Sequence, residues 1–349
     1  MKKLPVAILG ATGLVGQRLV QLLADHPWFE IRVLAASDNS VGKRYGEAAQ
    51  WKLPCEIPQA ARALLVQPCE PGMDVGMVFS ALPSDVAGAI EENFAARGYL
   101  ISSNASSHRM DTDVPLVISE VNPGHLDLIH VQRARRKSSG AIVCNANCST
   151  IHLTLALKPL ADTFGLRRVI VTTMQAESGT GYPGVASLDI LDNVIPFIGG
   201  EEPKVETEPL KILGALKNDH VSNADIRISA ACNRVATGDG HLETVSVEFV
   251  HKPNIDQLRR VMLQFRGEPQ VLQLPTAPAQ PIIVRDEPDR PQPRLDRDAE
   301  HGMATVVGRV RECNVLDLKF VLLGHNTLRG AAGGTLLNAE LLVAKKFIE

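Results

Sequence analysis

The stretch LPVAILGATGLVGQRLV, residues 4–20, decides the fold of the first half of the chain. It begins with an apolar run of the length of a buried strand, and from residue 13 apolar residues recur at helical spacing. Between the two runs lie Gly10, Gly13 and Gly16, spaced G-x-x-G-x-x-G as a variant of the dinucleotide fingerprint. Glycine permits a tight turn and close approach of the backbone to a pyrophosphate, which the start of the helix then binds. The stretch therefore predicts a strand–turn–helix unit that holds a dinucleotide.

The residues that follow continue this alternation of strand and helix. EIRVLAAS (30–37), DVGMVFSAL (74–82) and YLISSNA (99–105) have the composition of buried strands, and SDVAGAIEENFAARG (84–98) has a helical pattern. Strands that alternate with helices form parallel sheets covered on both faces. We therefore predict an α/β fold whose N-terminal part is a Rossmann-like, doubly wound parallel sheet.

Beyond residue 148 the pattern changes to long strands with few helices. One helix is predicted at 254–267, and a long one with a glycine-rich start at 326–349. The proline-rich, charged segment 267–300 is predicted to be a surface excursion, because strand-like sequence resumes after it. A mixed or antiparallel sheet covered on one face fits this pattern, so we predict an α+β second domain. The predicted strands are 166–179, 225–235, 241–252, 303–312 and 315–324.

The charge balance argues against several classes of partner. Hydrophobic residues make up 45% of the 349 residues and charged residues 21%, which is ordinary for a globular protein. The formal net charge of −3 and the pI near 6.4 give no support for nucleic acid or an anionic membrane as a partner. RARRK, 133–137, is the one dense basic run, and we interpret it as a solvated helix end or loop.

The N-terminus and the cysteines bear on the compartment. MKKLPVAILG copies the start of a signal peptide, but glycines interrupt the apolar run and an amphipathic segment follows. No other stretch approaches the roughly 18 apolar residues of a membrane helix. The six cysteines form no CxxC pair and no framework spacing. We expect free thiols in a reducing cytoplasm, and no bound metal.

The residues after the second predicted strand indicate which dinucleotide is bound. NAD enzymes usually place an acidic residue there, on the ribose hydroxyls. Here the strand ends at Ser37, and Ser40, Lys43 and Arg44 follow as candidate ligands of a 2′-phosphate. Asp38 is the counter-argument, since its carboxylate could face the ribose. We favour NADP over NAD, and the alternative is a turn of purely structural serines.

A second motif, CNANCSTIHL at 144–153, contains two cysteines. Cys148 opens an apolar-periodic helix, where the helix dipole and the free N–H groups lower the pKa of a thiol and can hold an oxyanion. A metal clip would need further ligands, and neither Cys144 nor His152 lies in a ligand cluster. Cys144 closes a strand and is expected in the core. On these grounds Cys148 as a nucleophile and Cys148 as an inert buried thiol remain equal alternatives.

Six motifs occur in order along nearly the whole chain: SNASSHRM (103–110), SEVNP (119–123), NANCST (145–150), QAESGTGYPG (175–184), RISAACNRVATGDGH (227–241) and GHNTLRGAAGG (324–334). Together they resemble the aspartate-β-semialdehyde dehydrogenase family, of the branch typical of archaea and fungi. N-acetyl-γ-glutamyl-phosphate reductases would show a GCY-type cysteine motif. Glyceraldehyde-3-phosphate dehydrogenases carry SCTTN where this chain has NCSTI.

The resemblance implies an NADP-dependent oxidoreductase that reduces L-aspartyl-4-phosphate to L-aspartate-4-semialdehyde, in lysine, threonine and methionine biosynthesis. It assigns Cys148 as the nucleophile and His241, in GDGH, as the acid/base. A thiolate displaces phosphate from the acyl phosphate and leaves a thioester, which accepts hydride well. Histidine suits the proton transfers because its pKa lies near neutrality. Taken in isolation, His241 would be interpreted as a turn residue.

The same resemblance implies a set of substrate contacts. A guanidinium fork suits a carboxylate, a carboxylate suits an ammonium group, and cations suit a phosphate. Arg234 would clamp the α-carboxylate, Glu208 would bind the α-ammonium, Lys211 and Arg109 would bind the phosphate, Gln175 would orient the acyl group, and Asn147 would precede the cysteine as in the family.

Two of these assignments leave alternatives open. Glu208 and Lys211 share a helix face at their spacing, so they could instead form a modest surface ion pair. Glu201, Glu202 and Lys204 lie nearby in the sequence and could be confused with them.

For the cofactor, the glycine loop and the resemblance together imply a longer set of contacts. Asn326 would reach the nicotinamide from the far end of the chain, and its alternative role is a helix N-cap. The implied cofactor contacts are Gly10, Ala11, Thr12, Gly13, Leu14, Val15, Gly16, Ser37, Ser40, Lys43, Ser80, Gly179 and Asn326.

The resemblance also implies a domain plan and an assembly. Residues 1–147 would form the NADP-binding domain, joined by a returning helix at 326–349, and 148–325 the catalytic and dimerisation domain with its mixed sheet. A homodimer or homotetramer is expected, because the long strands offer a large apolar face. Two other functions stay open: a malonyl-CoA reductase-like paralogue with the same cysteine and hydride chemistry, and a non-catalytic nucleotide-sensing protein.

Overall fold

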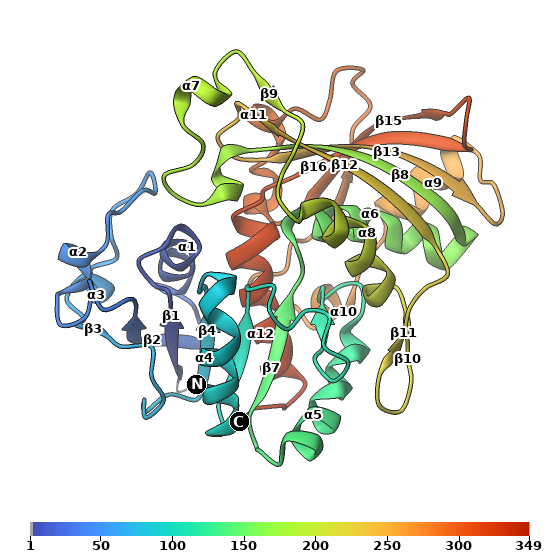
Figure 1. The fold of residues 1–349 in the computed structure, drawn as a ribbon. Coiled ribbons are helices and arrows are strands. Elements are labelled where there is room, and N and C mark those ends of the chain that lie inside the picture. The colour runs from blue at the N-terminus through green and yellow to red at the C-terminus, as the bar shows by residue number, and fades with distance from the viewer. Residues whose placement is uncertain (1–2, 349) are drawn as a thin grey trace.

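The structure is a computed structural model and describes residues 3–348. Its longer strands form two sheets, one built from the first 145 residues and one from residues beyond 165. Figure 1 shows the first sheet in the lower part of the molecule and the second sheet across the top, with helices between them. Within the described residues, no helix is both long and apolar enough to cross a membrane.

The first sheet is parallel throughout and has the strand order β3-β2-β1-β4-β5-β7-β6. From β1 the chain moves outward through β2 and β3, then returns to the other side of β1 through β4. This is the doubly wound topology that the sequence predicts, and such sheets bind ligands at the carboxyl ends of the strands where the order reverses. The strands are β1 (Leu4–Leu9), β2 (Phe29–Ala35), β3 (Val66–Gln67), β4 (Met77–Ser80), β5 (Leu100–Ser103), β6 (Leu116–Val117) and β7 (Ala141–Asn145).

Helices pack against the first sheet, and one of them comes from the C-terminal end of the described chain. Helix α12 contacts β5, β7 and α1, and Leu336 and Leu341 are buried in the same core as Val6 and Phe79. The helices of this part are α1 (Leu14–Leu23), α2 (Tyr45–Ala48), α3 (Gln59–Arg62), α4 (Ser84–Ala96), α5 (Leu128–Arg136) and α12 (Gly333–Ala344), with a 3-10 turn η1 (Pro123–Asp127).

The C-terminal segment differs from the single helix predicted at 326–349. It contains a π-helical turn, η4 (Leu328–Ala332), and α12 follows only from Gly333. Close packing explains the wider turn: a Cβ on Gly330 would lie 2.8 Å from Cβ of Cys148, and one on Gly333 would lie 2.5 Å from Sδ of Met303. The glycines therefore let this backbone approach the start of the helix at Cys148.

The second sheet is mixed, with the order β14-β15-β16-β13-β8-β12-β9, as predicted. Strand β8 runs parallel to β12 and antiparallel to β13. The sequence of β8 alternates between buried residues such as Val169 and Val171 and exposed ones such as Ile170, because only one face is covered. The strands are β8 (Leu166–Gln175), β9 (Val194–Ile195), β12 (Arg227–Val235), β13 (His241–Phe249), β14 (Ile282–Val284), β15 (Thr305–Glu312) and β16 (Leu318–Gly324).

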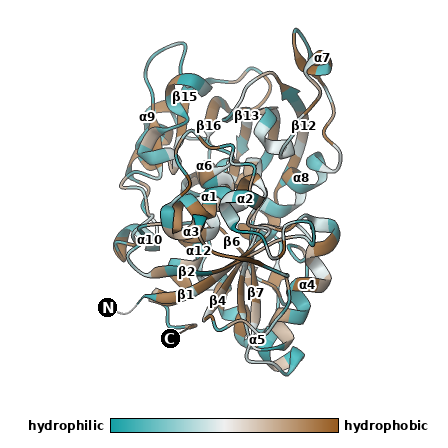
Figure 2. Ribbon diagram, turned by 90° about the vertical axis from the view of Figure 1, so that its left-hand side faces the viewer, coloured by the Kyte–Doolittle hydropathy of each residue, from teal (hydrophilic) through white to brown (hydrophobic). Residues whose placement is uncertain are grey.

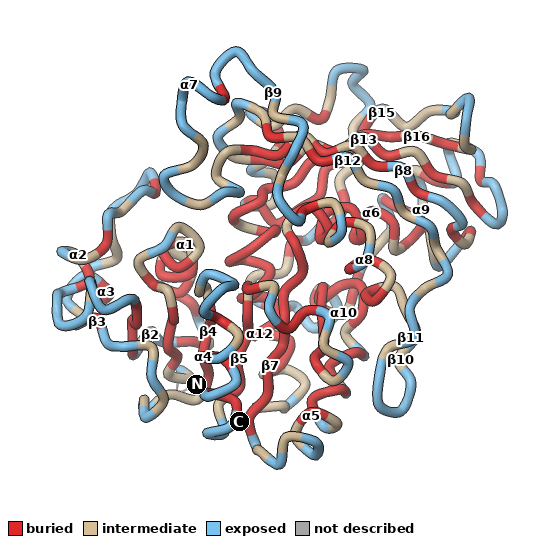
Figure 3. Tube along the Cα trace, viewed as in Figure 1, coloured by how far each residue is buried: buried red, intermediate tan, exposed pale blue. Residues whose placement is uncertain are grey.

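Three helices cover the inner face of this sheet, and Figure 1 shows them between the two sheets. They are α6 (Cys148–Phe164), α8 (Glu201–Ile212) and α9 (Ile255–Gln264). Helix α6 contacts β8, β13, β15 and β16 and is buried along most of its length, which Figure 3 shows in red. In Figure 2 the strands of the first sheet are largely brown, since apolar side chains cover both of its faces. The remaining hairpin is β10 (Ala215–Leu216) with β11 (Val221–Ser222).

The segment 267–300 is more than the predicted surface excursion. It contributes β14 to the edge of the second sheet, and Leu274 and Ile282 are buried in the two hydrophobic cores. The prediction was wrong here because single apolar residues among prolines and charges suffice to anchor such a segment. Its helical turns are α10 (Glu268–Val271), α11 (Pro293–Asp296) and η3 (Ala299–Gly302).

The basic run 133–137 ends α5, as predicted, but its arginines make specific contacts. Arg133 donates to the backbone oxygen of Phe347, and Arg136 donates to the carboxylate of Asp113. The run therefore holds neighbouring segments and is not a free cationic patch.

Candidate active site

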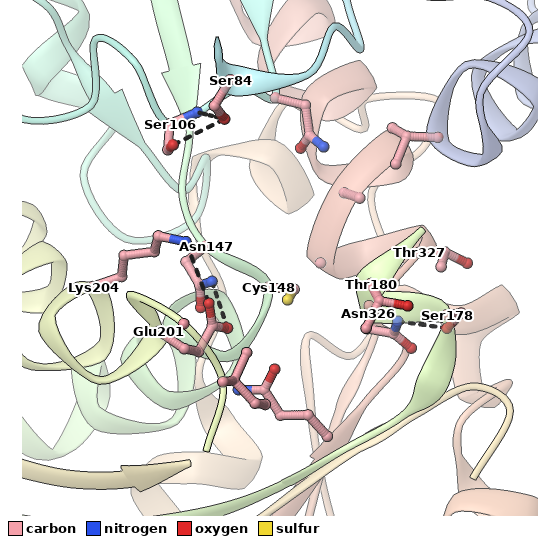
Figure 4. Close-up of a pocket in the computed structure, with 18 of the residues that line it drawn as sticks. Ser84, Ser106, Asn147, Cys148, Ser178, Thr180, Glu201, Lys204, Asn326 and Thr327 are labelled. Carbon is pink, nitrogen blue, oxygen red and sulfur yellow. Dashed lines mark hydrogen bonds and ion pairs between the residues drawn. The ribbon is translucent and has the colours of Figure 1, made fainter. Parts of the chain in front are cut away.

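A cavity of about 340 Å³ opens at the carboxyl edge of the first sheet, between it and the second sheet. Figure 4 shows Cys148 in its middle, with Asn147, Glu201 and Lys204 on one side and Ser178 and Asn326 on the other. Of the residues predicted to be functional, the following line it: Val15, Arg109, Asn147, Cys148, Gln175, Gly179, Arg234 and Asn326.

Cys148 lies at the first position of α6, directly after the turn that follows β7. Asn147 caps the helix, because its Oδ1 accepts the N–H groups of Ser149 and Thr150 at 3.0 and 3.1 Å. Gly330 in η4 packs against Cys148 from the other side. The cap and the glycine fix the sulfur at the junction of the two sheets.

The thiol of Cys148 is not activated in this structure. Burial, and after it the nearby carboxylate of Glu201, raise the pKa of Cys148 to about 12. Arg109, the N–H of Ser149 and Arg234 all lower it, in that order, without offsetting the loss of water. The predicted lowering of the pKa by the helix start is therefore wrong for the protein alone: the helix contribution is present and desolvation exceeds it. Cys148 is a thiol at neutral pH.

Two arginines supply positive charge to the cavity. Arg109 donates from Nη1 to Glu208 at 3.0 Å and from Nη2 to the Asn104 oxygen at 2.9 Å. Its Nε is buried and has no hydrogen-bond partner within residues 3–348. Arg234 donates from Nη1 to the backbone oxygen of Ala176 at 2.6 Å, and burial lowers its pKa. Both guanidinium groups are held rigidly at the cavity wall.

Glu208 and Lys211 are not where the sequence prediction requires them. Lys211 donates all three protons of its Nζ to backbone oxygens, those of Arg109 at 2.7 Å, Asp111 at 2.7 Å and Val114 at 2.9 Å. The carboxylate of Glu208 accepts from Arg109 and from the N–H of Asn147. Neither residue lines the cavity. Both are buried, so the alternative of a surface ion pair is wrong as well.

Glu201 and Lys204 occupy the place predicted for that pair. Glu201 accepts from Nδ2 of Asn147 at 2.8 Å, and Nζ of Lys204 lies 3.4 Å from the other carboxylate oxygen. Both line the cavity, as Figure 4 shows. Each precedes its counterpart by seven residues, about two helical turns, so the two pairs lie on the same face of α8. Helical periodicity alone could not separate them.

His241 lies behind the cavity wall. Its Nδ1 accepts the N–H of Ala176 at 3.0 Å, and its Nε2 has no hydrogen-bond partner in the described part of the chain. Burial, followed by the charge of Arg234, lowers the pKa of His241 well below its usual value. A Cβ on Gly179 would lie 3.2 Å from Nε2, so the ring packs closely against this glycine, which lines the cavity.

The glycine loop fits a dinucleotide. Gly10 has a φ of +73°, which favours glycine, and a Cβ on Gly16 would lie 2.2 Å from the oxygen of Gly10. Gly13 is the N-cap residue of α1 and has no side chain to cap it, so the first N–H groups of the helix are left for a ligand. The loop therefore has the close strand–helix packing and the free helix start that a pyrophosphate needs.

The outer cofactor residues are more scattered. Ser37 and Lys43 are exposed beyond the end of β2, where Lys43 donates to the Asn39 oxygen at 2.7 Å. Ser80 ends β4 fully buried. Asn326 accepts from the N–H of Gly240 at 2.8 Å and donates to Oγ of Ser178 at 2.7 Å. Its predicted alternative as a helix N-cap is wrong, because the helical turn starts at residue 328.

Comparison with known proteins identifies the family. A family model described as "Semialdehyde dehydrogenase, NAD binding domain" matches residues 5–129, and "Semialdehyde dehydrogenase, dimerisation domain" matches residues 157–329. The chain is 54% identical over 344 residues to an aspartate-semialdehyde dehydrogenase of Archaeoglobus fulgidus, covering 98% of this chain and 99% of that protein. The chain belongs to the aspartate-semialdehyde dehydrogenase family.

Further aspartate-semialdehyde dehydrogenases agree with this. One from Schizosaccharomyces pombe is 49% identical over 350 residues, covering 97% of this chain and 98% of that protein. The crystal structure of the enzyme from Candida albicans with NADP has a TM-score of 0.92 at 42% identity, covering 99% of this chain and 100% of that one. Aspartate semialdehyde dehydrogenase II from Vibrio cholerae, complexed with ASA, has a TM-score of 0.79 at 26% identity, covering 99% and 100%. The archaeal and fungal matches confirm the resemblance.

The residues predicted from the sequence do not include part of the cavity wall. Ser84, Asn104 and Ser106 line it, and Ser106 donates to Oγ of Ser84 at 2.9 Å. They follow the carboxyl ends of β4 and β5. That position is the signal that could have found them, because it is where ligands bind in such sheets. Thr180 and Thr327 also line the cavity, and although they lie within the motifs 175–184 and 324–334, they were not predicted as site residues.

Proposed function

We propose that this chain catalyses the NADP-dependent interconversion of L-aspartyl-4-phosphate and L-aspartate-4-semialdehyde, with Cys148 as the nucleophile. The observation that carries the proposal is the position of that cysteine. It lies at a capped helix start, in one cavity with two arginines, a lysine and a glutamate, beside a glycine loop that fits a dinucleotide. The step belongs to the biosynthesis of lysine, threonine and methionine.

The glycine loop supports the cofactor assignment, and the Candida albicans relative was crystallised with NADP. Gly10, Gly13 and Gly16 would hold the pyrophosphate at the start of α1, and Ser37, Ser40 and Lys43 would meet the 2′-phosphate. NADPH supplies a hydride to the acyl carbon when it is bound. Val15, Gly179 and Asn326, which line the cavity, would hold its nicotinamide end near Cys148.

The charges of the cavity match the two ends of the substrate. Arg109 and Lys204, which both line the cavity, would bind the phosphate group. Arg234 would clamp the α-carboxylate, and Glu201 would bind the α-ammonium. We assign the ammonium-binding carboxylate to Glu201 and the phosphate-binding lysine to Lys204, in place of Glu208 and Lys211, whose polar atoms bind other parts of the protein.

The same charges explain how a thiol could become a nucleophile. Glu201 raises the pKa of Cys148, and an ammonium group bound to Glu201 would neutralise that effect. Arg109 and Arg234 would then favour the thiolate. Gln175, which is fixed by its bond from Nε2 to Thr173 at 3.2 Å, would orient the acyl group. The substrate therefore supplies part of the activation that the protein alone lacks.

The test is reduction of NADP by L-aspartate-4-semialdehyde, measured with inorganic phosphate present or omitted. We expect phosphate-dependent NADPH formation that is lost in Cys148→Ala and kept in Cys313→Ala, a cysteine outside the cavity. Equal rates in Cys148→Ala and the native chain would refute the mechanism. Turnover with coenzyme A in place of phosphate would favour a CoA-dependent paralogue.

We also propose a homo-oligomer, most simply a dimer, in a reducing cytoplasm. All six cysteines are free, which suits that compartment. The outer face of the second sheet exposes Ile170, and the segment 187–197, which contains α7 (Ser187–Ile190), carries Leu188, Leu191 and Phe197, whose exposed fractions are 91%, 62% and 71%. A second copy covering this apolar surface would bury it. Light scattering should give about twice the chain mass of 37.7 kDa, and Ile170→Asp should halve it.

A further inference from the structure

One glutamate of α4, the helix that packs on β5 and β7, is fully buried. Glu91 has no exposed surface, whereas its neighbour Glu92 is exposed. A carboxyl group loses its hydration on burial, which costs free energy and raises the pKa of Glu91. Within residues 3–348 this group makes one hydrogen bond: Oε1 accepts from Oγ of Ser103 at 2.7 Å, and Oε2 has no partner. The fold therefore buries a carboxyl group at a cost, which indicates a role for its one hydrogen bond.

Ser103 connects this carboxyl group to a segment that lines the cavity. Ser103 is the last residue of β5, and its Oγ accepts the N–H of Ala105 at 3.1 Å. Because the same hydroxyl donates its proton to Glu91, it bridges the carboxyl group and the backbone. The backbone oxygen of Asn104 accepts from Nη2 of Arg109 at 2.9 Å. The series of bonds that begins at Glu91 therefore ends at a guanidinium group in the cavity wall.

Two further residues of α4 bind the same segment, 103–109. Oγ of Ser84 accepts from the N–H of Ser106 at 3.1 Å and from its hydroxyl at 2.9 Å, and Figure 4 shows both serines beside the cavity. The backbone oxygen of Gly88 lies 3.2 Å from Nε2 of His108. Positions 84, 88 and 91 follow the spacing i, i+4, i+7, so they share one face of the helix. One face of α4 therefore binds the segment at three points.

We propose that Glu91 is a positioning residue for phosphate binding: through Ser103 it fixes the segment 103–109 and, with it, the guanidinium group of Arg109. The proposal rests on the proposed function, in which Arg109 binds the phosphate. A guanidinium group recognises phosphate through a planar fork of donors, so a displaced Asn104 oxygen would misalign that fork. Glu91 is not among the residues that line the cavity, so its effect on the substrate passes through these bonds.

The first test measures the KM for inorganic phosphate in the direction that oxidises the semialdehyde. Ser103→Ala, which removes only a hydroxyl, and Glu91→Leu both break the bond between the two residues. Each should raise this KM about fivefold, the contribution of one net hydrogen bond, and leave the KM for NADP unchanged. Glu92→Leu, one position along the same helix and exposed, is the matched control and should change neither. An unchanged KM for phosphate in Ser103→Ala and Glu91→Leu, whatever their Tm, would overturn the proposal.

The second test separates the hydrogen bond from the space that the side chain fills. Glu91→Gln keeps Oε1 as an acceptor for Ser103, and its amide N–H can donate to the nearby buried hydroxyl of Ser80, so it should have the native KM for phosphate. A chain with both Glu91→Leu and Ser103→Ala should have no higher KM than Ser103→Ala alone, because both changes break the same bond. Additive effects, or a glutamine variant as impaired as the leucine variant, would contradict a role through Ser103.

The third test follows the segment itself, by hydrogen exchange of peptides that span residues 103–109. The amide of Ala105 is buried and bonded to Ser103, so exchange should be faster in Ser103→Ala and Glu91→Leu and native in Glu91→Gln and Glu92→Leu. Native exchange in Glu91→Leu would show that Glu91 does not fix the segment, and would overturn the proposal. Because this measurement needs neither substrate nor cofactor, it decides the role of Glu91 even if the proposed function fails.

Discussion

At the scale of single residues, two lysines on one face of α8 have different roles. Lys204 is proposed to bind the substrate, whereas Lys211 stabilises the fold. Lys204→Met should raise the KM for inorganic phosphate by tenfold or more with little change in Tm, since Lys204 lines the cavity and is only loosely paired. Lys211→Met should leave three buried backbone oxygens without a donor and lower the free energy of unfolding by about 2–3 kcal/mol or more. Steady-state kinetics and urea unfolding distinguish them. If Lys211→Met instead affected only the KM for phosphate, the phosphate would be bound by Lys211, as the sequence predicted, and not by Lys204.

Glu243 gives a second prediction at this scale. Both of its carboxylate oxygens are buried without a hydrogen-bond partner among the described residues, and burial, then Glu201, raises its pKa well above 4.5. The folded chain keeps this proton where the unfolded chain has lost it, so stability falls by about 1.4 kcal/mol per pH unit above about pH 4.5, up to the folded pKa. Glu243→Gln should remove that slope and be more stable at pH 7. Exposed Glu92→Gln on α4 is the control and should change nothing.

Measured by urea unfolding from pH 5 to 8, parallel stability curves for the native chain and Glu243→Gln would show that the carboxyl is ionised in the fold.

The same residue shows why site chemistry was only partly predictable. A glutamate two positions after His241 on a strand shares its face, which the sequence shows. That the face is the buried one, and that neither carboxyl oxygen meets a hydrogen-bond donor among the described residues, depends on α6, which packs on β13.

Residue types were therefore more predictable than residue positions. Cys148, Arg109 and Arg234 line one cavity as expected, because each lies in a distinct motif. Glu201 and Glu208 were interchanged because a seven-residue shift returns to the same helix face. The pKa of Cys148 was predicted in the wrong direction because the helix start is visible in sequence, whereas the desolvation of the thiol and the proximity of Glu201 depend on tertiary packing.

At the scale of elements, two glycines of the cofactor loop make opposite predictions. A Cβ on Gly16 would lie 2.2 Å from the oxygen of Gly10, against backbone that cannot yield, so Gly16→Ala should separate α1 from β1 and lower Tm strongly. A Cβ on Gly13 would meet only the Gly10 oxygen at 3.5 Å, an ordinary contact. Gly13→Ala should keep its Tm while binding NADP more weakly, because the methyl group lies where the pyrophosphate approaches.

Thermal unfolding and NADP titration measure the two effects separately. If Gly16→Ala unfolds at the same temperature as the native chain, the close packing of α1 on β1 is not required for stability.

The elements themselves were well predicted wherever periodicity is strong: β1, α1, α4, α6 and the long strands β8, β12 and β13 all form as expected. The π-turn η4 and the short strand β14 were not predicted, because they arise from contacts with α6 and β15 that are distant in sequence.

At the scale of the whole molecule, α6 joins the two sheets and so determines where chemistry can occur. Its first residue lies at the carboxyl edge of the first sheet, and its length covers the second (Figure 1). The C-terminal segment then crosses back, placing η4 against Cys148 and α12 against the first sheet. The two parts therefore share one cavity, and any loosening of the C-terminal segment should affect catalysis as well as stability.

A buried ion pair holds that segment and yields the last prediction. Arg329 in η4 donates to both carboxylate oxygens of Glu120, which lies after β6, and both side chains are almost fully buried. Gln270 in α10 adds a bond to the same carboxylate at 3.4 Å. Glu120→Gln leaves the guanidinium without its counter-charge and should lower the free energy of unfolding by about 3–5 kcal/mol.

The control for this pair is Glu268 in α10, which pairs with Lys345 of the C-terminal segment at 2.9 Å but is partly exposed. Glu268→Gln should cost less than about 1 kcal/mol, because solvent screens such pairs. Urea unfolding measures both variants. Cys148 should also be alkylated faster in Glu120→Gln, because Gly330, next to Arg329, packs against Cys148. Equal stability of the two variants would mean that the apolar residues of α12 alone hold the C-terminal segment in place. The contact of this segment with Cys148 would then not depend on the ion pair.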